Sequence, residues 1–312
     1  MANAFLKSET IAATALGLLE REMVLSRLVW TSGGFDFTGA KNDAVTIRVP
    51  ATTTAREYEW RSDRSSDIVL DELAEDSVTV QLNKDIYSAV AITDEELTLD
   101  IKDFGSQVLQ PQVNAIAKAV DTGVASMIED AAYANTTTFN KADPWESLID
   151  ARGMLNRANV PQEGRTLLMG ADVETALLKS NRISDVSKSG SDSALRSATL
   201  GRLAGFDLVV SNAIAPDKAY AFVPSAFVLA TRAPAIPSGV TSGSSQSYNG
   251  LAMRWIRDYD ANKLRDRSIL NVYAGYNVMV DPVGTGKNPP KKLVRAVKLD
   301  MAAAPSKPST GA

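Results

Sequence analysis

The chain has 312 residues, of which 33 are basic and 37 acidic, so its formal net charge at pH 7 is only −4. It contains neither cysteine nor histidine, which excludes disulfides, thiolate zinc sites, cysteine nucleophiles and the usual histidine base of hydrolases. The near balance of charge argues against a dedicated nucleic-acid reader, and no apolar run approaches the roughly 20 residues of a membrane span.

The first segment, residues 1–43, is expected to form an amino-terminal arm. Its apolar residues follow a helical stripe, and those expected to pack are Leu18, Leu25 and Leu28. The stretch IAATALGLL resembles a signal-peptide core, but charged residues follow it at once and no small-residue cleavage site does. We interpret it as an amphipathic helix whose apolar side needs a partner, either in the same chain or in a neighbouring one.

Residues 44–83 are expected to form an extended β-hairpin, because AVTIRV and SVTVQL alternate apolar and polar residues with period two. An isolated hairpin is marginal in water, so we expect it to lie against something else. Its charged middle is either a solvated loop or a docking surface that sets the register between subunits. The residues of this candidate assembly interface are Arg56, Glu57, Glu59, Arg61, Asp63, Arg64 and Asp67.

A strand is predicted over residues 85–91, and Thr93 with Glu96 predicts a capping box that opens a short helix. The acidic residues Asp94, Glu95 and Asp100 raise the alternative of a carboxylate-dependent enzyme. We favour a structural role, because carboxylates at a helix start are stabilised by the helix dipole and no spaced pair with an oriented partner is present. We therefore expect no enzyme activity, no cofactor, no catalytic residues and no metal site.

A single long helix is predicted over Ile101–Ala134, where apolar residues recur at steps of three and four. The residues expected in its core are Leu109, Val113, Ile116, Val120, Val124 and Met127. The opposite side is expected to stay hydrated, and it carries Gln112, Lys118, Asp121, Ser126, Glu129 and Asp130. Pro111 either starts the main helix or kinks it one turn in.

Residues 140–249 predict a compact mixed domain inserted after the helix, with alternating helices and short buried strands. The helices are expected at 144–158 and 171–179, the strands at 165–170 and 206–210, and a mobile Pro-, Gly- and Ser-rich loop at 231–247.

Residues 84–139 and the long strands of 250–300 are expected to form a peripheral domain, whose sheet we expect to be covered on both sides because it shows no clean polar face. Residues 301–312 are expected to be a disordered tail.

Two glycine motifs fail as phosphate-binding sites. Gly284–Lys287 resembles the end of a phosphate loop, but Asn288 replaces the magnesium-binding Ser or Thr, and two prolines forbid the helix that should follow. GRLAG at 201–205 precedes a predicted strand instead of following one. The lysines near the end of the chain are typical of a protected strand edge.

The order of parts resembles the tailed-bacteriophage major capsid proteins of the Hong Kong 97-type fold. VLQPQVNAIAKAVDTGVASMIEDA is similar to the spine helix of that family. GRLAGFDLVVSNAIAPDKAYAFVPSAFVLATRAP and RWIRDYDANKLRDRSILNVYAGYNVMVDP are similar to segments of its podovirus-type coat branch. The resemblance covers nearly the whole chain and implies an α+β fold with a long spine helix, an extended β-hairpin loop, a peripheral domain and an inserted axial domain.

The resemblance implies a major capsid protein that self-assembles as pentamers and hexamers into the icosahedral head of a tailed bacteriophage enclosing double-stranded DNA. The implied partners are further copies of the chain, a separate scaffolding protein, a portal protein, a decoration protein and packaged DNA held by non-specific contact, with no membrane. The implied location is the virion capsid, after assembly in the host cytoplasm. The alternative is an encapsulin-like shell protein of the same fold that houses cargo.

Some relatives crosslink their subunits through a lysine of the extended loop. No lysine lies between Lys41 and Lys84 in this chain, so we expect no isopeptide crosslinks.

Overall fold

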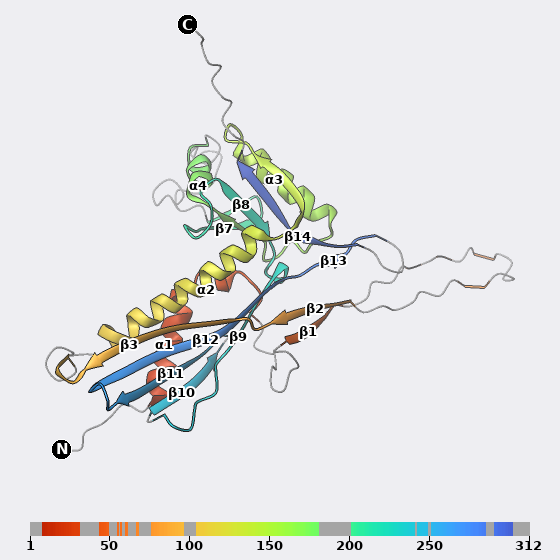
Figure 1. Cartoon of the computed structure of the whole chain (residues 1–312). Coiled ribbons are helices and arrows are strands. Elements are labelled where there is room, and N and C mark those ends of the chain that lie inside the picture. The colour runs from red at the N-terminus through yellow and green to blue at the C-terminus, as the bar shows by residue number, and fades with distance from the viewer. Residues whose placement is uncertain are drawn as a thin grey trace, which may run out of the picture.

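The computed structural model describes residues 8–31, 44–49, 55, 57, 60–61, 67–68, 76–96, 104–180, 201–240, 242–248, 251–284 and 290–301. These residues form two sheets, a two-stranded ribbon and several helices (Figure 1). The α-helices are α1 (Ser8–Glu22), α2 (Gln110–Asp130), α3 (Pro144–Arg157) and α4 (Ala171–Leu178).

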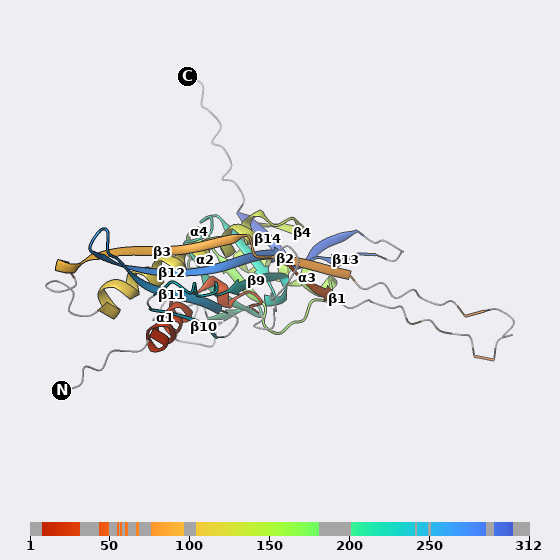
Figure 2. The same ribbon diagram turned by 60° about the horizontal axis from the view of Figure 1, so that its bottom comes forward.

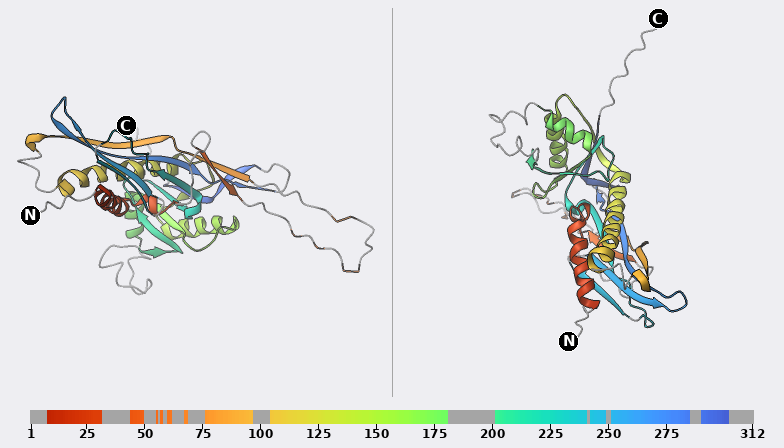
Figure 3. Two further views of the ribbon diagram at one scale, coloured as in Figure 1. Left: turned by 90° about the horizontal axis from the view of Figure 1, so that it is seen from below. Right: turned by 90° about the vertical axis from the view of Figure 1, so that its left-hand side faces the viewer.

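A five-stranded sheet forms one half of the molecule. Its order is β10-β11-β12-β3, and β9 pairs with the second half of β12; every pairing is antiparallel. Helices α1 and α2 lie side by side on one face of this sheet (Figures 1 and 3). The strands are β3 (Lys84–Thr93), β9 (Phe227–Arg232), β10 (Ser242–Tyr248), β11 (Leu251–Asp260) and β12 (Arg265–Val278).

A seven-stranded sheet forms the other half. Its order is β13-β14-β8-β5-β7-β6, and β4 pairs with β14 in parallel. Its side chains alternate between two cores: Ala219 and Ala221 of β8 pack under α3 and α4, whereas Tyr220 and Phe222 face the core around α2. The strands are β4 (Tyr133–Phe139), β5 (Thr166–Met169), β6 (Arg202–Leu203), β7 (Phe206–Val210), β8 (Lys218–Phe222), β13 (Asp281–Pro282) and β14 (Lys291–Met301).

The ribbon consists of β1 (Ala44–Val49) and β2 (Asp76–Gln81), paired antiparallel from Ala44–Gln81 to Val49–Asp76. The period-two prediction for these two stretches is confirmed. In Figures 1 and 2 the ribbon lies beyond the end of the five-stranded sheet, where β2 leads directly into β3.

The long helix is shorter than predicted. Its α-helical part begins at Gln110 and ends at Asp130, a five-residue π-helical turn Gly105–Leu109 precedes it, and residues 101–103 lie outside the described residues. Pro111, which has no amide to donate, occupies the first turn of α2. The helix stops because Ala131 is already extended and Tyr133 enters the seven-stranded sheet, while the Tyr133 hydroxyl donates to the Ile128 carbonyl at 2.7 Å.

In the described part of the chain, the second face of the five-stranded sheet is only partly covered. Its second face carries Arg254, Asn271 and Tyr87 in one register row, and Tyr87 is 70% exposed. The segment after β9 lies over β10 and β11, where the Pro234 carbonyl accepts from the Ser245 hydroxyl and the Ala235 carbonyl accepts from Arg254. Sequence alternation did not resolve the two faces, because buried Asn271 and exposed Tyr87 reverse the usual link between polarity and exposure.

Two further expectations differ from the structure. The predicted loop 231–247 contains β10, because its serine-rich backbone pairs with β11 and α1 packs on it. Strand pairing also departs from the expected division at residues 140 and 249. Strand β9 joins the five-stranded sheet, whereas β14 supplies a central strand of the other sheet.

Candidate assembly surfaces

The root of the ribbon is fixed by a small apolar core. Val78 and Val80 of β2 are buried against Val228 and Ala230 of β9 and against Met279. Asn277 of β12 donates its side-chain amide to the Thr79 carbonyl. The ribbon therefore leaves the body in a direction set by β9 and β12.

Gly275 of β12 lies where the chain passes from β2 to β3. A Cβ atom at this position would overlap the Gln81 carbonyl and press on Leu82. Only glycine allows the two backbones to come this close, so Gly275 helps to set the angle of the ribbon.

The described residues beyond the ribbon root are all exposed. Three predicted interface residues are among them, namely Glu57, Arg61 and Asp67. Arg61 has φ +61°, a left-handed conformation typical of a tight chain reversal. Four more predicted interface residues, Arg56, Glu59, Asp63 and Arg64, lie outside the described residues.

Sequence reasoning assigned this surface to charged residues alone and missed two large apolar side chains. Trp60 is 85% exposed and Ile68 is 67% exposed. Tryptophan is highly buried on average in folded proteins and is enriched in binding hot spots. A tryptophan inside a run of charges was the signal available in the sequence.

The arm packs on its own chain. Leu25 is buried, while Leu18 and Leu28 are half-buried against the same core. Asp121 of α2 holds the end of the arm: its carboxylate accepts from the amides of Val24, Leu25 and Ser26 at 2.8, 3.2 and 3.1 Å and from the Ser26 hydroxyl at 2.6 Å. The apolar side of the arm therefore has its partner within the chain.

Residue Trp30 extends the arm to the ribbon root. Its amide donates to the carbonyls of Pro224 and Phe227, both at 3.0 Å, and its carbonyl accepts from Leu229 at 3.1 Å. Its side chain packs against the core beneath the ribbon. The arm, the ribbon and both sheets consequently meet around Trp30.

The residues predicted for the core of the long helix lie at the interface between α2 and the sheets. Met127 is half-buried, and the buried ones are Leu109, Val113, Ile116, Val120 and Val124. The expected hydrated side is only partly hydrated. Lys118, Ser126 and Asp130 are exposed, but Gln112, Asp121 and Glu129 are used in tertiary contacts.

Gln112 is the clearest correction on that side, because it is only 1% exposed. Its amide donates to the carbonyls of Ser88 and Ser268 at 3.1 and 2.9 Å. Its own carbonyl accepts from the Ser268 hydroxyl, which in turn accepts from the Trp255 indole at 3.0 Å. This satisfied polar network joins α2 to the sheet, and helical periodicity cannot reveal such a partner.

The acidic residues considered for catalysis are placed at the end of β3. The capping box is confirmed, since Thr93 and Glu96 exchange hydrogen bonds at 2.9 and 3.3 Å. Asp94 accepts from the Tyr259 hydroxyl at 2.9 Å, and this bond raises the pKa of Tyr259. Glu95 is exposed, and Asp100 lies outside the described residues.

The described part of the chain holds neither a candidate metal site nor a candidate membrane-spanning helix. No group of three or more histidine, cysteine or acidic residues there is arranged to hold a metal ion. No described helix is long and apolar enough to cross a membrane.

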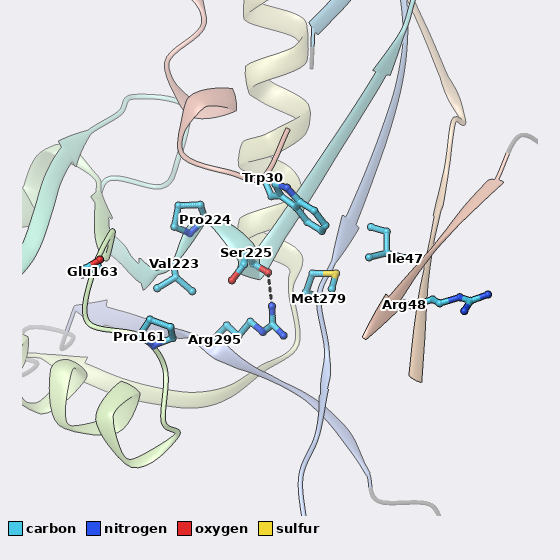
Figure 4. Close-up of a pocket in the computed structure, with 10 residues that line it drawn as sticks. All are labelled: Trp30, Ile47, Arg48, Pro161, Glu163, Val223, Pro224, Ser225, Met279 and Arg295. Carbon is cyan, nitrogen blue, oxygen red and sulfur yellow. Dashed lines mark hydrogen bonds between the residues drawn. The ribbon is translucent and has the colours of Figure 1, made fainter. Parts of the chain in front are cut away.

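A pocket of about 480 Å³ lies beside the ribbon root (Figure 4). Its apolar wall consists of Trp30, Ile47, Pro161, Val223, Pro224 and Met279. Arg48, Glu163, Ser225 and Arg295 also line it. Arg295 is held in place by Asp281, at 2.7 Å from its Nε, and by the Ser225 carbonyl at 3.2 Å. The pocket thus combines an apolar wall with charges of both signs.

Comparison with known proteins bears on these surfaces. A family model described as phage capsid protein matches residues 76–288. No curated protein matches the chain.

Solved structures share the fold. A structure from Mycobacterium phage Che8 is 18% identical with a TM-score of 0.63, covering 89% of this chain and 90% of that one. A structure from Microbacterium phage Oxtober96 is 12% identical with a TM-score of 0.60, covering 97% and 95%. A virus-like particle from Pyrococcus furiosus is 11% identical with a TM-score of 0.52, covering 93% and 97%.

Proposed function

The chain belongs to the phage capsid protein family and has the Hong Kong 97-type fold, and from this membership we propose that it is the major capsid protein of a tailed bacteriophage. In this proposal it assembles as pentamers and hexamers into an icosahedral head that encloses double-stranded DNA. The site of action is the capsid of the virion, and assembly takes place in the host cytoplasm.

The exposed ribbon is the observation that carries the proposal. Its root is anchored by a core of its own, whereas every described residue between β1 and β2 is exposed, including a tryptophan. A ribbon of this kind is marginal without a surface to lie on. We infer that a neighbouring subunit provides that surface, and that residues 56–67 contact its peripheral domain.

The inserted domain supplies the second proposed contact. Its helices α3 and α4 and its strands β5 to β8 form a lobe together with β4 and β14, and this lobe has its own core under α3 and α4, at the opposite end of α2 from β10 (Figure 1). Copies of this lobe are proposed to meet around the local symmetry axes. Contacts that repeat around a closed ring stabilise a shell even when each one is modest.

The remaining partners follow from the same proposal. They are a separate scaffolding protein during assembly, a portal protein, a decoration protein, and packaged DNA held without sequence preference. The role is structural, and we propose no catalytic activity and no cofactor.

The test is negative-stain electron microscopy of the purified, concentrated protein, with and without extract from infected cells to supply scaffolding. Closed shells, tubes or polymers of capsomers are the expected result. A monodisperse monomer under both conditions would overturn the proposal.

An encapsulin-like shell that houses cargo is the second candidate, because the virus-like particle from Pyrococcus furiosus shares the fold. The contents of particles purified from the native source separate the two functions. Nuclease-protected double-stranded DNA supports the phage head, whereas an enclosed enzyme without DNA supports the cargo shell.

A further inference from the structure

We propose that Trp60, at the exposed end of the ribbon, inserts into the pocket beside the ribbon root of a second copy of this chain. The inference rests on the proposed function, since it requires self-assembly. It adds which residue of one subunit contacts which pocket of the next. Two independent observations carry it, namely an exposed tryptophan and a pocket of matching chemistry.

Trp60 is the first observation. Its 85% exposure is the highest among the exposed large apolar side chains of the described residues. It adjoins Arg61, whose positive φ marks a chain reversal, so its indole is presented at a turn. Burial of an indole contributes more apolar area than burial of most side chains, which makes an exposed tryptophan a strong anchor for a partner.

The pocket is the second observation. Its volume of about 480 Å³ lies in the range of sites that enclose a compact apolar group. Its walls include one aromatic ring, Trp30, and two prolines, Pro161 and Pro224, which offer flat apolar surfaces to an indole (Figure 4). The exposed Glu163 carboxylate at the same pocket is a suitable acceptor for the indole N–H.

One charge pair fits this arrangement. Arg61 follows Trp60 in the sequence, and the exposed Glu163 lines the pocket. Arg61 can therefore pair with Glu163 when Trp60 enters the pocket. Such a pair sets the orientation of a contact more than its affinity.

The occupant comes from another copy. Trp60 is almost fully exposed in its own chain, so it does not fill its own pocket. The pocket is bordered by Ile47 and Arg48 of the receiving ribbon and by Trp30 of the receiving arm. Each tip would thus dock against the root of the next ribbon, giving a head-to-tail contact that can close into rings.

Cysteine crosslinking tests this arrangement, because the chain has no cysteine of its own. The test variant combines Arg61→Cys with Glu163→Cys, which keeps Trp60 and changes two exposed positions. The positional control combines Arg61→Cys with Lys263→Cys, since Lys263 is exposed at the turn between β11 and β12. A third variant adds Trp60→Ala to the test pair. Each variant is assembled without added unmodified chain, because a crosslink needs two neighbouring subunits that both carry cysteines. The particles are then treated with a short bismaleimide and run on a denaturing gel.

The expected result is a ladder of multimers for the test pair and none for the positional control. Trp60→Ala should reduce the ladder by about tenfold. A ladder is diagnostic, because an isologous contact would stop at dimers. Shells without crosslinks at the test pair, stronger crosslinks to Lys263→Cys, or no effect of Trp60→Ala would overturn the inference. Absence of shells from the unmodified chain would instead overturn the proposed function.

Discussion

Asp121 and Ser26 are joined twice, since one carboxylate oxygen of Asp121 accepts both the Ser26 amide at 3.1 Å and the Ser26 hydroxyl at 2.6 Å. The other oxygen accepts the amides of Val24 and Leu25. A single side chain of α2 thereby satisfies three backbone amides at the point where α1 has ended and no helical partner remains.

Replacement of Asp121 should release the arm. We expect Asp121→Ala to lower the free energy of unfolding by about 2 kcal/mol or more, because hydrogen bonds to a charged group are lost and partly buried amides remain unsatisfied. Urea denaturation measures the loss, and tryptic cleavage at Arg27 should become faster. Ser26→Ala, which removes only one of the bonds, should cost about 1 kcal/mol. Equal stability of Asp121→Ala and the unmodified chain would contradict this role.

Substitution of Gly275 should redirect the ribbon. We expect Gly275→Ala to lower the free energy of unfolding by about 1–3 kcal/mol, since the new methyl group overlaps the Gln81 carbonyl, and to impair shell formation. Circular dichroism and electron microscopy measure the two effects. Gly17→Ala is the matched control, because nothing lies within 4 Å of a Cβ at that exposed helical position, and it should be neutral or stabilising. Normal shells from Gly275→Ala would show that the ribbon angle tolerates the change.

Charge reversal at the ribbon end should impair assembly without unfolding the subunit. Arg61 is exposed, and Arg61→Glu combined with Arg64→Glu removes charges that we propose to dock across a subunit boundary. The monomer's melting temperature should stay unchanged, while light scattering should show slower or absent assembly. Lys263→Glu provides a control that reverses one positive charge at an exposed turn, half of the charge change in the double variant. Normal assembly of the double variant would refute the docking role.

Alkaline pH should weaken the fold through buried tyrosines. Burial, with the Asp121 charge as a second cause, raises the pKa of Tyr276 to about 12. Below pH 10 the hydroxyl is protonated in both the folded and the unfolded chain. Between pH 10 and about pH 12 the unfolded chain loses the proton first, so the free energy of unfolding falls with rising pH. The total fall over this range is on the order of 2 kcal/mol.

Urea denaturation across this pH range tests the effect with Tyr276→Phe. The decline should be shallower in the variant but should not vanish, because burial also raises the pKa of Tyr133 and Tyr220. An identical pH profile in both proteins would show that Tyr276 does not carry this dependence.

Mature particles should release single chains on a denaturing gel. The absence of lysine between Lys41 and Lys84 leaves the extended loop without the amine needed for an isopeptide bond. Boiled particles should therefore give one band at the monomer mass of 33.3 kDa. A ladder of covalent multimers from unmodified particles would refute this expectation.

Local patterns in the sequence were sufficient to predict most helices and strands. Alternation predicted β1 and β2, and the three-and-four spacing predicted the buried face of α2, because both patterns reflect one covered side. Sheet membership was beyond such patterns. β8 and β9 form one apolar stretch around a short 3₁₀ turn at Pro224–Ala226, yet they enter different sheets, and this depends on partners far away in the chain.

For the candidate surfaces, too, local patterns predicted some residues, whereas contacts with distant parts of the chain could not be predicted. The charged residues near the ribbon end could be named from the sequence, since a polar run between two strands marks an exposed turn. Asp121 and Gln112 were predicted to be hydrated, because helical periodicity reflects only the polarity of each residue. It holds no information about the arm amides and Ser268, which form hydrogen bonds with these two side chains. The pocket beside Trp30 is lined by six separate parts of the chain, so no local sequence pattern indicates it.

The pairing of β14 has a consequence for how the chain folds. β14 follows every other described strand, yet it lies between β4 and β8, with Phe139 opposite Met301 and Tyr220 opposite Lys298. During synthesis, the strands of the inserted lobe emerge from the ribosome well before the strand that fills the gap between them. Closing contacts over such sequence separations is slow, so the nascent lobe exposes unpaired strand edges for much of translation. We therefore expect this half of the molecule to be the last to fold and the one that most depends on chaperones.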